Sequence, residues 1–355
     1  MPRRPDGAAI VMMSLLAALL IVPFVLPASP TRHSDATRKG THSHDLAAGA
    51  PHWYVTVHGG GDLADVFALD EAGRVIGGVL GPVPEGPSTL KELRGVCLTG
   101  DGRLAVVNAF LQQSRVLLFG PPNANDVRPF QSVWAEEGPV NPGMVHPYQI
   151  AIAPDGTLYV SNQDTNTVTR YRGLGSDQPG QPLPIPTGLK EFGTLPPGTI
   201  VPNSQHSPEG LHEVRGIAFG PDGLLYVADR VGQSVATYDT ATGRRTRIVF
   251  DKSQGLGHPI QLLFTPDRQA LLIGDNLHHC VWRHNLASGS TNQLVAPGSG
   301  ELNAPSALAI EGTHLFVGSR LGKSILRYDL ESGRFLGVFA RLNSNPEFFI
   351  STQQK

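Results

Sequence analysis

The sequence is poor in cysteine and in charge of either sign. Two cysteines in 355 residues exclude the disulfide framework of a small secreted scaffold. The 28 Lys and Arg nearly balance the 30 Asp and Glu, which leaves a net charge of −2. Because the chain has no basic excess, we expect no nucleic-acid partner. Long stretches of helical periodicity are also missing, so the sequence does not predict a helical bundle.

Glycine and proline are abundant instead. The chain has 41 Gly and 30 Pro, and 40% of its residues are hydrophobic. This composition is typical of an all-β fold built from many short strands and turns. A chain of this length can bury a large core, as one large domain or two ordinary ones.

The N-terminus carries a long apolar run. Residues 8–28, AAIVMMSLLAALLIVPFVLPA, contain Ser14 as the only polar side chain. As a helix they are long enough to span a bilayer of roughly 30 Å. Ala28 is the best position for signal cleavage, but Leu26 is large for such a site. We therefore predict a signal-anchor helix within 1–28, with a cleaved signal peptide as the alternative. A polar tether over 29–50 then leads to a domain outside the cytoplasm, membrane-anchored or secreted.

A hairpin pattern recurs along the rest of the chain. RGIAFGPDGLLYVAD at 215–229 repeats YQIAIAPDGTLYVSN at 148–162, and related copies begin at Arg94, Ile260 and Ser306. In each full copy a short apolar run precedes a Pro-Asp-Gly turn, and a second apolar run follows it. A third strand comes next, and several copies also show a fourth. Four strands per repeat, at spacings of about 44 to 67 residues, are typical of propeller blades.

Two further segments complete the count. Residues 54–80 supply three strands of another blade, and 345–351, NPEFFIS, match the first-strand segment HPYQIAI of 146–152. We predict a six-bladed β-propeller over 51–352 in which this C-terminal strand closes the first blade. One position in each third strand is expected to lie between blades, and it is occupied by Phe119, Tyr171, Tyr238, His284 and Tyr328.

The recurring PDG-x-LYVAD pattern resembles the NHL-repeat propellers and their regucalcin/gluconolactonase-like and strictosidine-synthase-like relatives over about 53–351. This resemblance implies a fold that hosts lactonases, lyases, amidating lyases and pure binding proteins. Gluconolactonase-like members hold a divalent ion with an acid, an Asn and an Asp at the starts of first strands. Only Glu347 fits that pattern here, and the histidines that amidating lyases use there are missing from those positions.

In such propellers the first strands line the channel, and the second strands end at the same face, called the mouth here. The long connection within 172–213 is expected to land on this face as a lid. The first strands start with Arg94, Tyr148, Arg215, Ile260, Ser306 and Glu347, and the second strands end with His58, Asn108, Asn162, Asp229, Asp275 and Ser319. From these we select as candidate ligand-binding residues His58, Arg94, Asn108, Tyr148, Asn162, Arg215, Asp229, Asp275 and Glu347.

Two functions remain open at this mouth. Arg94 and Arg215 suit a carboxylate or phosphate, which predicts a binding module for a small anionic ligand or a protein partner. Asn162, Asp229 and Asp275 are oxygen ligands of the kind that calcium takes, and His58 with the aspartates offers acid–base chemistry. These residues predict the alternative, a lactonase-like hydrolase or a lyase. We expect a monomer in either case.

Overall fold

The structure is a computed structural model, and it describes residues 50–58, 65–84, 90–110 and 113–353. All of them belong to one compact unit, His44–Lys355. The predicted apolar helix over 8–28 and most of the tether lie outside the described residues. Within the described ranges, no helix has the length and hydrophobicity needed to cross a membrane.

Six four-stranded antiparallel sheets form the blades, so the chain is an all-β, six-bladed propeller. Blade 1 contains β24 (Asn345–Ser351), β1 (Trp53–His58), β2 (Val66–Leu69) and β3 (Val75–Gly78). Blade 2 contains β4 (Leu93–Leu98), β5 (Leu104–Asn108), β6 (Arg115–Phe119) and β7 (Phe130–Glu136). Blade 3 contains β8 (Pro147–Ile152), β9 (Leu158–Asn162), β10 (Thr167–Tyr171) and β11 (Thr199–Val201).

The remaining three blades follow the same order from the axis outward. Blade 4 contains β12 (Val214–Phe219), β13 (Leu225–Asp229), β14 (Ser234–Tyr238) and β15 (Arg245–Asp251). Blade 5 contains β16 (Pro259–Phe264), β17 (Ala270–Asp275), β18 (Cys280–Asn285) and β19 (Thr291–Val295). Blade 6 contains β20 (Pro305–Glu311), β21 (His314–Ser319), β22 (Ser324–Asp329) and β23 (Phe335–Arg341).

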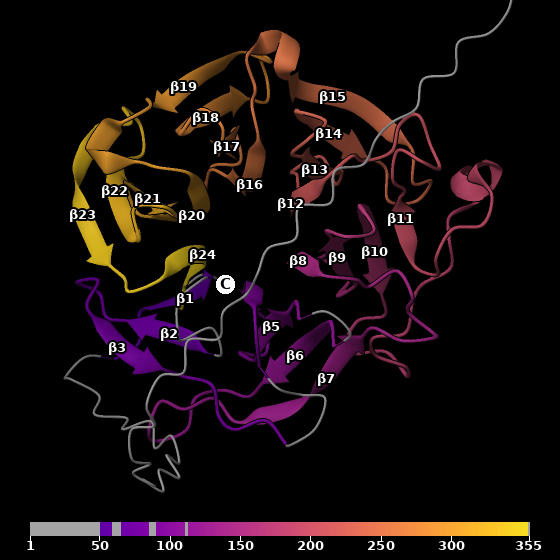
Figure 1. The fold of residues 1–355 in the computed structure, drawn as a ribbon, viewed down its shortest axis with the longest axis horizontal. Coiled ribbons are helices and arrows are strands. Elements are labelled where there is room, and N and C mark those ends of the chain that lie inside the picture. The colour runs from indigo at the N-terminus through magenta and orange to yellow at the C-terminus, as the bar shows by residue number, and fades with distance from the viewer. Residues whose placement is uncertain (1–49, 59–64, 85–89, 111–112, 354–355) are drawn as a thin grey trace, which may run out of the picture. The chain divides into compact units, whose positions relative to one another are not determined.

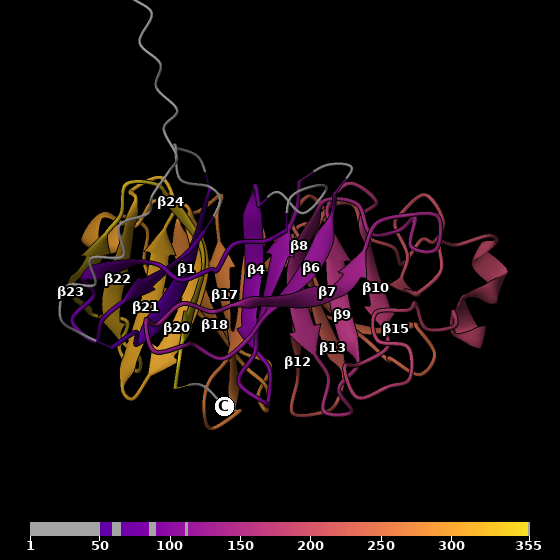
Figure 2. The ribbon, with the colours of Figure 1, turned by 90° about the horizontal axis from the view of Figure 1, so that it is seen from below.

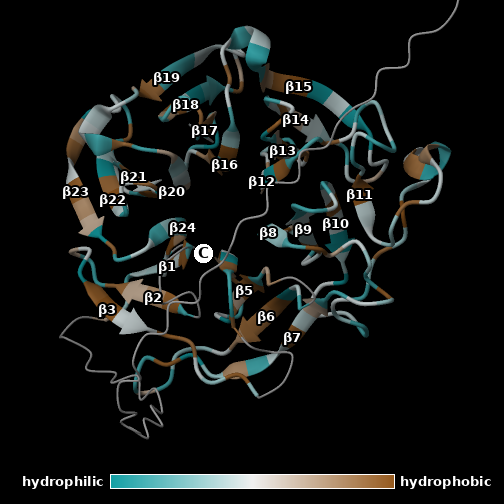
Figure 3. Ribbon diagram, viewed as in Figure 1, coloured by the Kyte–Doolittle hydropathy of each residue, from teal (hydrophilic) through white to brown (hydrophobic). Residues whose placement is uncertain are grey.

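The first strand of each blade lies nearest the axis (Figure 1), and each contacts the first strands of its two neighbours. Edge-on, the connecting loops gather on two opposite faces of the propeller (Figure 2). Hydrophobic stretches concentrate in the strands, whereas many of the turns are hydrophilic (Figure 3). This arrangement leaves the channel mouth to the loops and to the ends of the inner strands.

The core lies between the blades. The buried hydrophobic side chains form clusters that each draw mainly on two neighbouring blades. A blade is a thin sheet whose faces are both apolar, so it gains stability only by packing against its neighbours. The third-strand positions expected between blades are all at most 5% exposed: Phe119, Tyr171, Tyr238, His284 and Tyr328. That prediction is confirmed.

The C-terminal strand β24 lies in the sheet of blade 1, with Trp53 opposite Ser351 and Val55 opposite Phe349. The Trp53 and Phe349 rings stack with centroids 4.5 Å apart. Phe316 of blade 6 packs on the same indole at 4.7 Å. Blade 1 is therefore assembled from both ends of the described chain, and its aromatic residues contact blade 6.

The described helices are short 3-10 segments: η1 (Thr187–Phe192), η2 (Lys252–Gln254) and η3 (Ser299–Glu301). The prediction that residues 172–213 cover the mouth as a lid is wrong for most of that segment. β10 and β11 are antiparallel third and fourth strands, so residues 172–198 connect them at the end away from the mouth. Figure 1 places the η1 segment at the outer edge of blade 3. Only residues 202–213, which lead into β12, return to the mouth.

Candidate functional site at the mouth of the channel

A polar cavity of about 210 Å³ lies at the mouth. Its walls are Arg94, Tyr148, Gln163, Arg215, Arg230, Ile260, Asn276, Ser306, Arg320 and Glu347. All six residues expected at the starts of the first strands are among them. The structure therefore brings the predicted inner ring together around one space.

A backbone irregularity explains why these six residues face the axis. In each blade the pairing between first and second strands shifts where the ring residue sits, so the first strand holds one residue more than its partner. In blade 5, for example, Pro259 pairs with Asp275 and Gln261 with Gly274, which leaves Ile260 over. A β-bulge of this kind turns the extra side chain out of the sheet. Here it directs one residue per blade into the channel.

Glycine follows the ring residue where inner strands come closest. A Cβ atom on Gly95 would lie 2.9 Å from the Cα of Gln149 in blade 3, and one on Gly216 would lie 2.6 Å from the carbonyl oxygen of Ile260. Blades 2 and 4 therefore share the order Glu-x-Arg-Gly, in which glycine admits the neighbouring strand.

The cavity has two halves that differ in charge. The first, called the neutral half, consists of Arg94, Arg320 and Glu347 together with Glu92. Arg94 pairs with Glu92 at 2.6 Å and with Glu347 at 3.3 Å, and Arg320 pairs with Glu347 at 2.6 Å. Two arginines thus meet two glutamates, and Arg94 and Glu347 are only 6% and 2% exposed.

His146 extends the network of the neutral half. Its Nε2 lies 3.0 Å from Glu92 and its Nδ1 lies 3.1 Å from Asp164. The hydrogen bond with Glu92 is the main reason why the pKa of His146 is raised. Burial alone would raise the pKa of Glu92, but His146 and Arg94 outweigh it and lower the pKa to about 2. Burial alone would lower the pKa of Arg94, but the nearby charge of Glu347 and the other groups around it outweigh burial, so the pKa of Arg94 is raised.

The second half, called the charged half, consists of Arg215, Arg230, Gln163 and Asn276 together with Glu213. Glu213 pairs with both Arg215 and Arg230, the latter at 2.7 Å. Two arginines therefore share one glutamate, and one positive charge is left over. Burial lowers the pKa of Arg215, in contrast to the raised pKa of Arg94.

Tyr148 lies between the two halves. The guanidinium carbons of Arg94 and Arg215 lie 5.9 and 5.3 Å from its ring centroid. The ring is nearly buried, and burial raises the pKa of the phenol far above its ordinary value. Tyr148 therefore keeps its proton and presents a neutral O–H that can donate to a ligand.

Asn108, Asp229 and Asp275 were expected to bind a ligand. In the structure, these second-strand ends accept hydrogen bonds from the protein's own backbone. Asp275 accepts the backbone N–H groups of Gly257 and His258 at 2.8 and 2.9 Å, and the indole N–H of Trp282 at 3.0 Å. Asp229 accepts the N–H groups of His212, Glu213 and Gly232, and Asn108 that of Lys91. Ser319 accepts that of Asn303. These side chains fasten the segment that enters the first strand.

The remaining two second-strand ends differ from this group. Asn162 is fully buried and donates to Thr169 within its own blade at 2.9 Å. His58 is not part of the cavity wall. Burial is the main cause of its lowered pKa, followed by the charge of Arg94.

The arrangement does not fit the calcium ion considered at Asn162, Asp229 and Asp275. N–H groups surround the carboxylates of Asp229 and Asp275, and N–H hydrogens repel a cation. Among the described residues, no three His, Cys, Asp or Glu side chains come together as a metal site. Asp229 and Asp275 also face the Nδ1 atoms of His212 at 3.2 Å and of His278 at 2.9 Å, but none of these four side chains lines the cavity, so the pairs give the acid–base alternative no group inside it.

Sequence reasoning missed Gln163, Arg230, Asn276 and Arg320. Each directly follows a second-strand end, namely Asn162, Asp229, Asp275 and Ser319. Successive side chains of an extended chain point in opposite directions, so the residue after an inward-fastened one is free to face the cavity. The repeat therefore does locate these cavity residues, at the position directly after each second-strand end.

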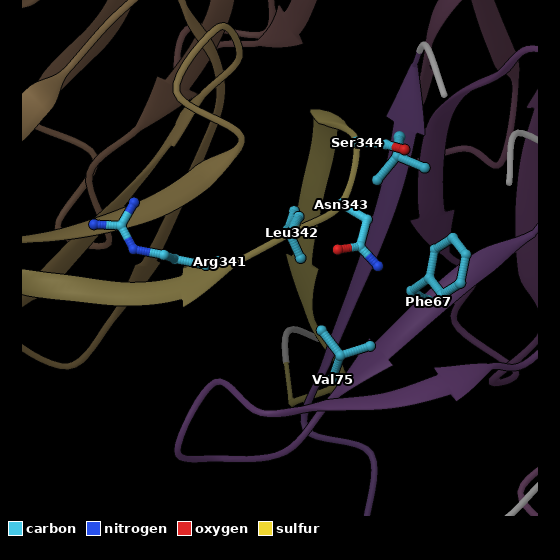
Figure 4. Close-up of a pocket in the computed structure, with 7 residues that line it drawn as sticks. Phe67, Val75, Arg341, Leu342, Asn343 and Ser344 are labelled. Atoms are coloured by element: carbon cyan, nitrogen blue, oxygen red, sulfur yellow. The ribbon is translucent and has the colours of Figure 1, made fainter. Parts of the chain in front are cut away.

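A smaller cavity of about 110 Å³ lies where the chain passes from β23 to β24 (Figure 4). Its walls are Val57, Phe67, Val75, Arg341, Leu342, Asn343 and Ser344. Arg341, the only charged group among them, pairs with Glu301 at 3.3 Å. This cavity offers a ligand little beyond apolar contact, so the mouth is the stronger candidate site.

Comparison with known proteins identifies the fold alone. No family model and no curated protein matches the chain. A structure described as a nidogen/laminin complex aligns with 85% of this chain and 98% of its own, at 15% identity and a TM-score of 0.58. A computationally designed protein, Ika8, aligns with 83% of this chain and 76% of its own, at 13% identity and a TM-score of 0.45. In all, 1196 solved chains match, so the shared propeller does not select a function.

Proposed function

We propose that this chain is an extracytoplasmic, NHL-like β-propeller that binds a small anion, or an anionic group of a protein partner, at the channel mouth. The observation that carries the proposal is the composition of the cavity wall, which holds four arginines and one carboxylate. Guanidinium groups bind carboxylate and phosphate through paired N–H donors. Low exposure around the cavity strengthens these contacts relative to bulk water.

The proposal is tested by calorimetric titration of the purified domain with organic carboxylates, inorganic phosphate and calcium in parallel. We expect one equivalent of an anion to bind, calcium to give no heat of binding, and Arg215→Gln to weaken anion binding. Stoichiometric calcium binding with no anion binding would instead support the metal-dependent hydrolase.

The location of the protein belongs to the same proposal. The apolar run of residues 8–28 and its poor cleavage site support a membrane anchor, with the propeller on the far side of the membrane from the cytoplasm. In its own host, the protein should fractionate with membranes and resist extraction by high salt. A mature N-terminus near Ser29 would show instead that the segment is cleaved.

Closure by the C-terminal strand is also part of this proposal, because β24 supplies Glu347 to the mouth. Strand pairing at blade 1 then fixes the carboxylate that holds Arg94 and Arg320 in place. We propose that the domain acts as a monomer, since each blade meets two neighbours within one chain. Light scattering after size exclusion should give the mass of one chain.

A further inference from the structure

The two halves of the cavity are occupied to different degrees by the protein's own groups. In the neutral half, Glu347 accepts a hydrogen bond from Arg320 and forms an ion pair with Arg94. Beside it, the Ser306 hydroxyl lies 2.5 Å from the carbonyl oxygen of Pro346. Each of these side chains already has a partner. A ligand that bound here would have to displace an ion pair that is almost fully buried.

The charged half offers groups that are still available. No hydrogen bond joins the side-chain amide of Gln163 or Asn276 to another described residue. They lie in blades 3 and 5, on either side of the Arg215 and Arg230 pair of blade 4. Glu213 takes one N–H group from each arginine, which leaves further guanidinium donors in both.

The charge balance fixes the number of negative charges that the ligand can bring. Asp229 does not line the cavity, and its oxygens accept three backbone N–H groups. Among the side chains that line the cavity and the glutamates that pair with them, the excess is therefore the single positive charge that Arg215 and Arg230 leave over against Glu213. A second negative charge in this space would lie near Glu213 and Glu347 without a cation of its own.

Size limits the ligand as well. About 210 Å³ is less than the roughly 300–1,000 Å³ of most small-molecule pockets. Ile260 supplies apolar surface beside the charged half. A carboxylate with a compact apolar body satisfies both the volume and this surface.

We propose that the mouth binds one monoanionic carboxylate through Arg215 and Arg230, with Gln163 and Asn276 as flanking donors, while Arg94, Arg320 and Glu347 form a rigid frame. This inference rests on the proposed function and narrows it to a ligand class and to one half of the cavity. A free small acid and an Asp or Glu side chain of a protein partner share this chemistry.

A matched pair of variants tests the assignment. Arg230 and Arg320 each directly follow a second-strand end, are 32% and 31% exposed as side chains, and pair with one glutamate. We expect Arg230→Gln to weaken binding of benzoate by about tenfold or more, which is the loss of one charge-assisted contact. Arg320→Gln should change it by less than about threefold. Circular dichroism and melting curves verify that both variants fold.

Four probes complete the experiment, each titrated into the intact propeller by calorimetry or by ligand-observed NMR. Benzoate should bind more tightly than phenyl phosphate, which carries two charges, and neutral benzamide should not bind. N-acetyl-aspartate amide represents a protein side chain, so its affinity relative to benzoate distinguishes the two sources of carboxylate.

Three results would overturn the assignment while leaving the proposed anion site intact: tighter binding of phenyl phosphate, equal losses in both variants, or a larger loss in Arg320→Gln. Binding of none of the anions overturns both proposals.

Discussion

The two halves of the mouth use the same residue types to different ends. In the neutral half, arginines and glutamates are matched one to one around the almost fully buried Arg94 and Glu347, so their charges hold blades 6, 1 and 2 together. In the charged half, blade 4 presents two arginines against one glutamate. An arginine at this mouth is therefore available to a ligand only where the protein's own carboxylates do not already match its charge.

We expect the largest effect from removing β24, which disrupts the neutral half. Truncation after Ser344 deletes Glu347 and the buried Phe348 and Phe349. Each buried aromatic contributes roughly 1.5–3 kcal/mol, and the domain has about 5–15 kcal/mol in total. The exposed edge of β1 would also invite aggregation. We expect an insoluble or far less stable protein by solubility and melting assays.

Truncation after Thr352 is the control, because it keeps all of β24 and should leave the melting temperature unchanged. If the shorter protein melts like the full chain, β24 contributes nothing to the ring.

A second prediction compares one glutamate from each half. Glu347→Gln leaves the buried Arg94 short of a partner, and breaking a buried ion pair costs about 3–5 kcal/mol. Glu213 is partly exposed, so Glu213→Gln should cost only about 1–2 kcal/mol. The same change should tighten benzoate binding by up to about tenfold, since a competing carboxylate is lost. Urea denaturation and calorimetry measure both. Equal stability losses would contradict the division into halves.

The sequence was enough to predict the inner ring of first-strand residues. It was not enough to predict the cavity residues that follow the second-strand ends, or the ion-pair partners of the arginines. Strand starts recur at a fixed place in each repeat, and the bulge at that place turns residues such as Arg94 and Arg215 to the axis. The partners of Arg94 and Arg215 depend on contacts between blades, which a repeat does not encode. At the second-strand ends, the period of two made Asp229 a fastening residue and Arg230 a cavity residue.

A third prediction concerns pH and the neutral half. The pKa of His146 is raised above 6.5, chiefly by its hydrogen bond with Glu92. Protonated His146 therefore stabilises the fold fully below about pH 6.5, and this contribution is lost as the pH rises through the raised pKa. The stability difference between wild type and His146→Gln should be larger at pH 6 than at pH 9 by about 1 kcal/mol. A difference that does not change with pH would contradict the role assigned to this network.

We expect the smallest effect in the reactivity of the two thiols, which lie on opposite sides of the ring. Cys97 in blade 2 and Cys280 in blade 5 are both free, and burial raises the pKa of each to about 12. Neither should react with a thiol reagent in the native state, and reducing agents should not change the melting temperature. During slow denaturation, we expect Cys280 to be labelled slightly before Cys97, because fewer ion pairs hold its side of the mouth. Cys97→Ser and Cys280→Ser separate the two signals.

The alternation at the second-strand ends bears on how such a protein can diversify. Asp229 fastens the backbone while Arg230, its neighbour, faces the cavity, and Asp275 and Asn276 divide the work in the same way. A substitution at the facing position can alter ligand preference without disturbing the fastening that keeps the blade in place. Because the arrangement recurs from blade to blade, a lineage could exchange several contacts independently. A protein engineer could randomise Gln163, Arg230 and Asn276 as a library and keep Arg320, which pairs with Glu347.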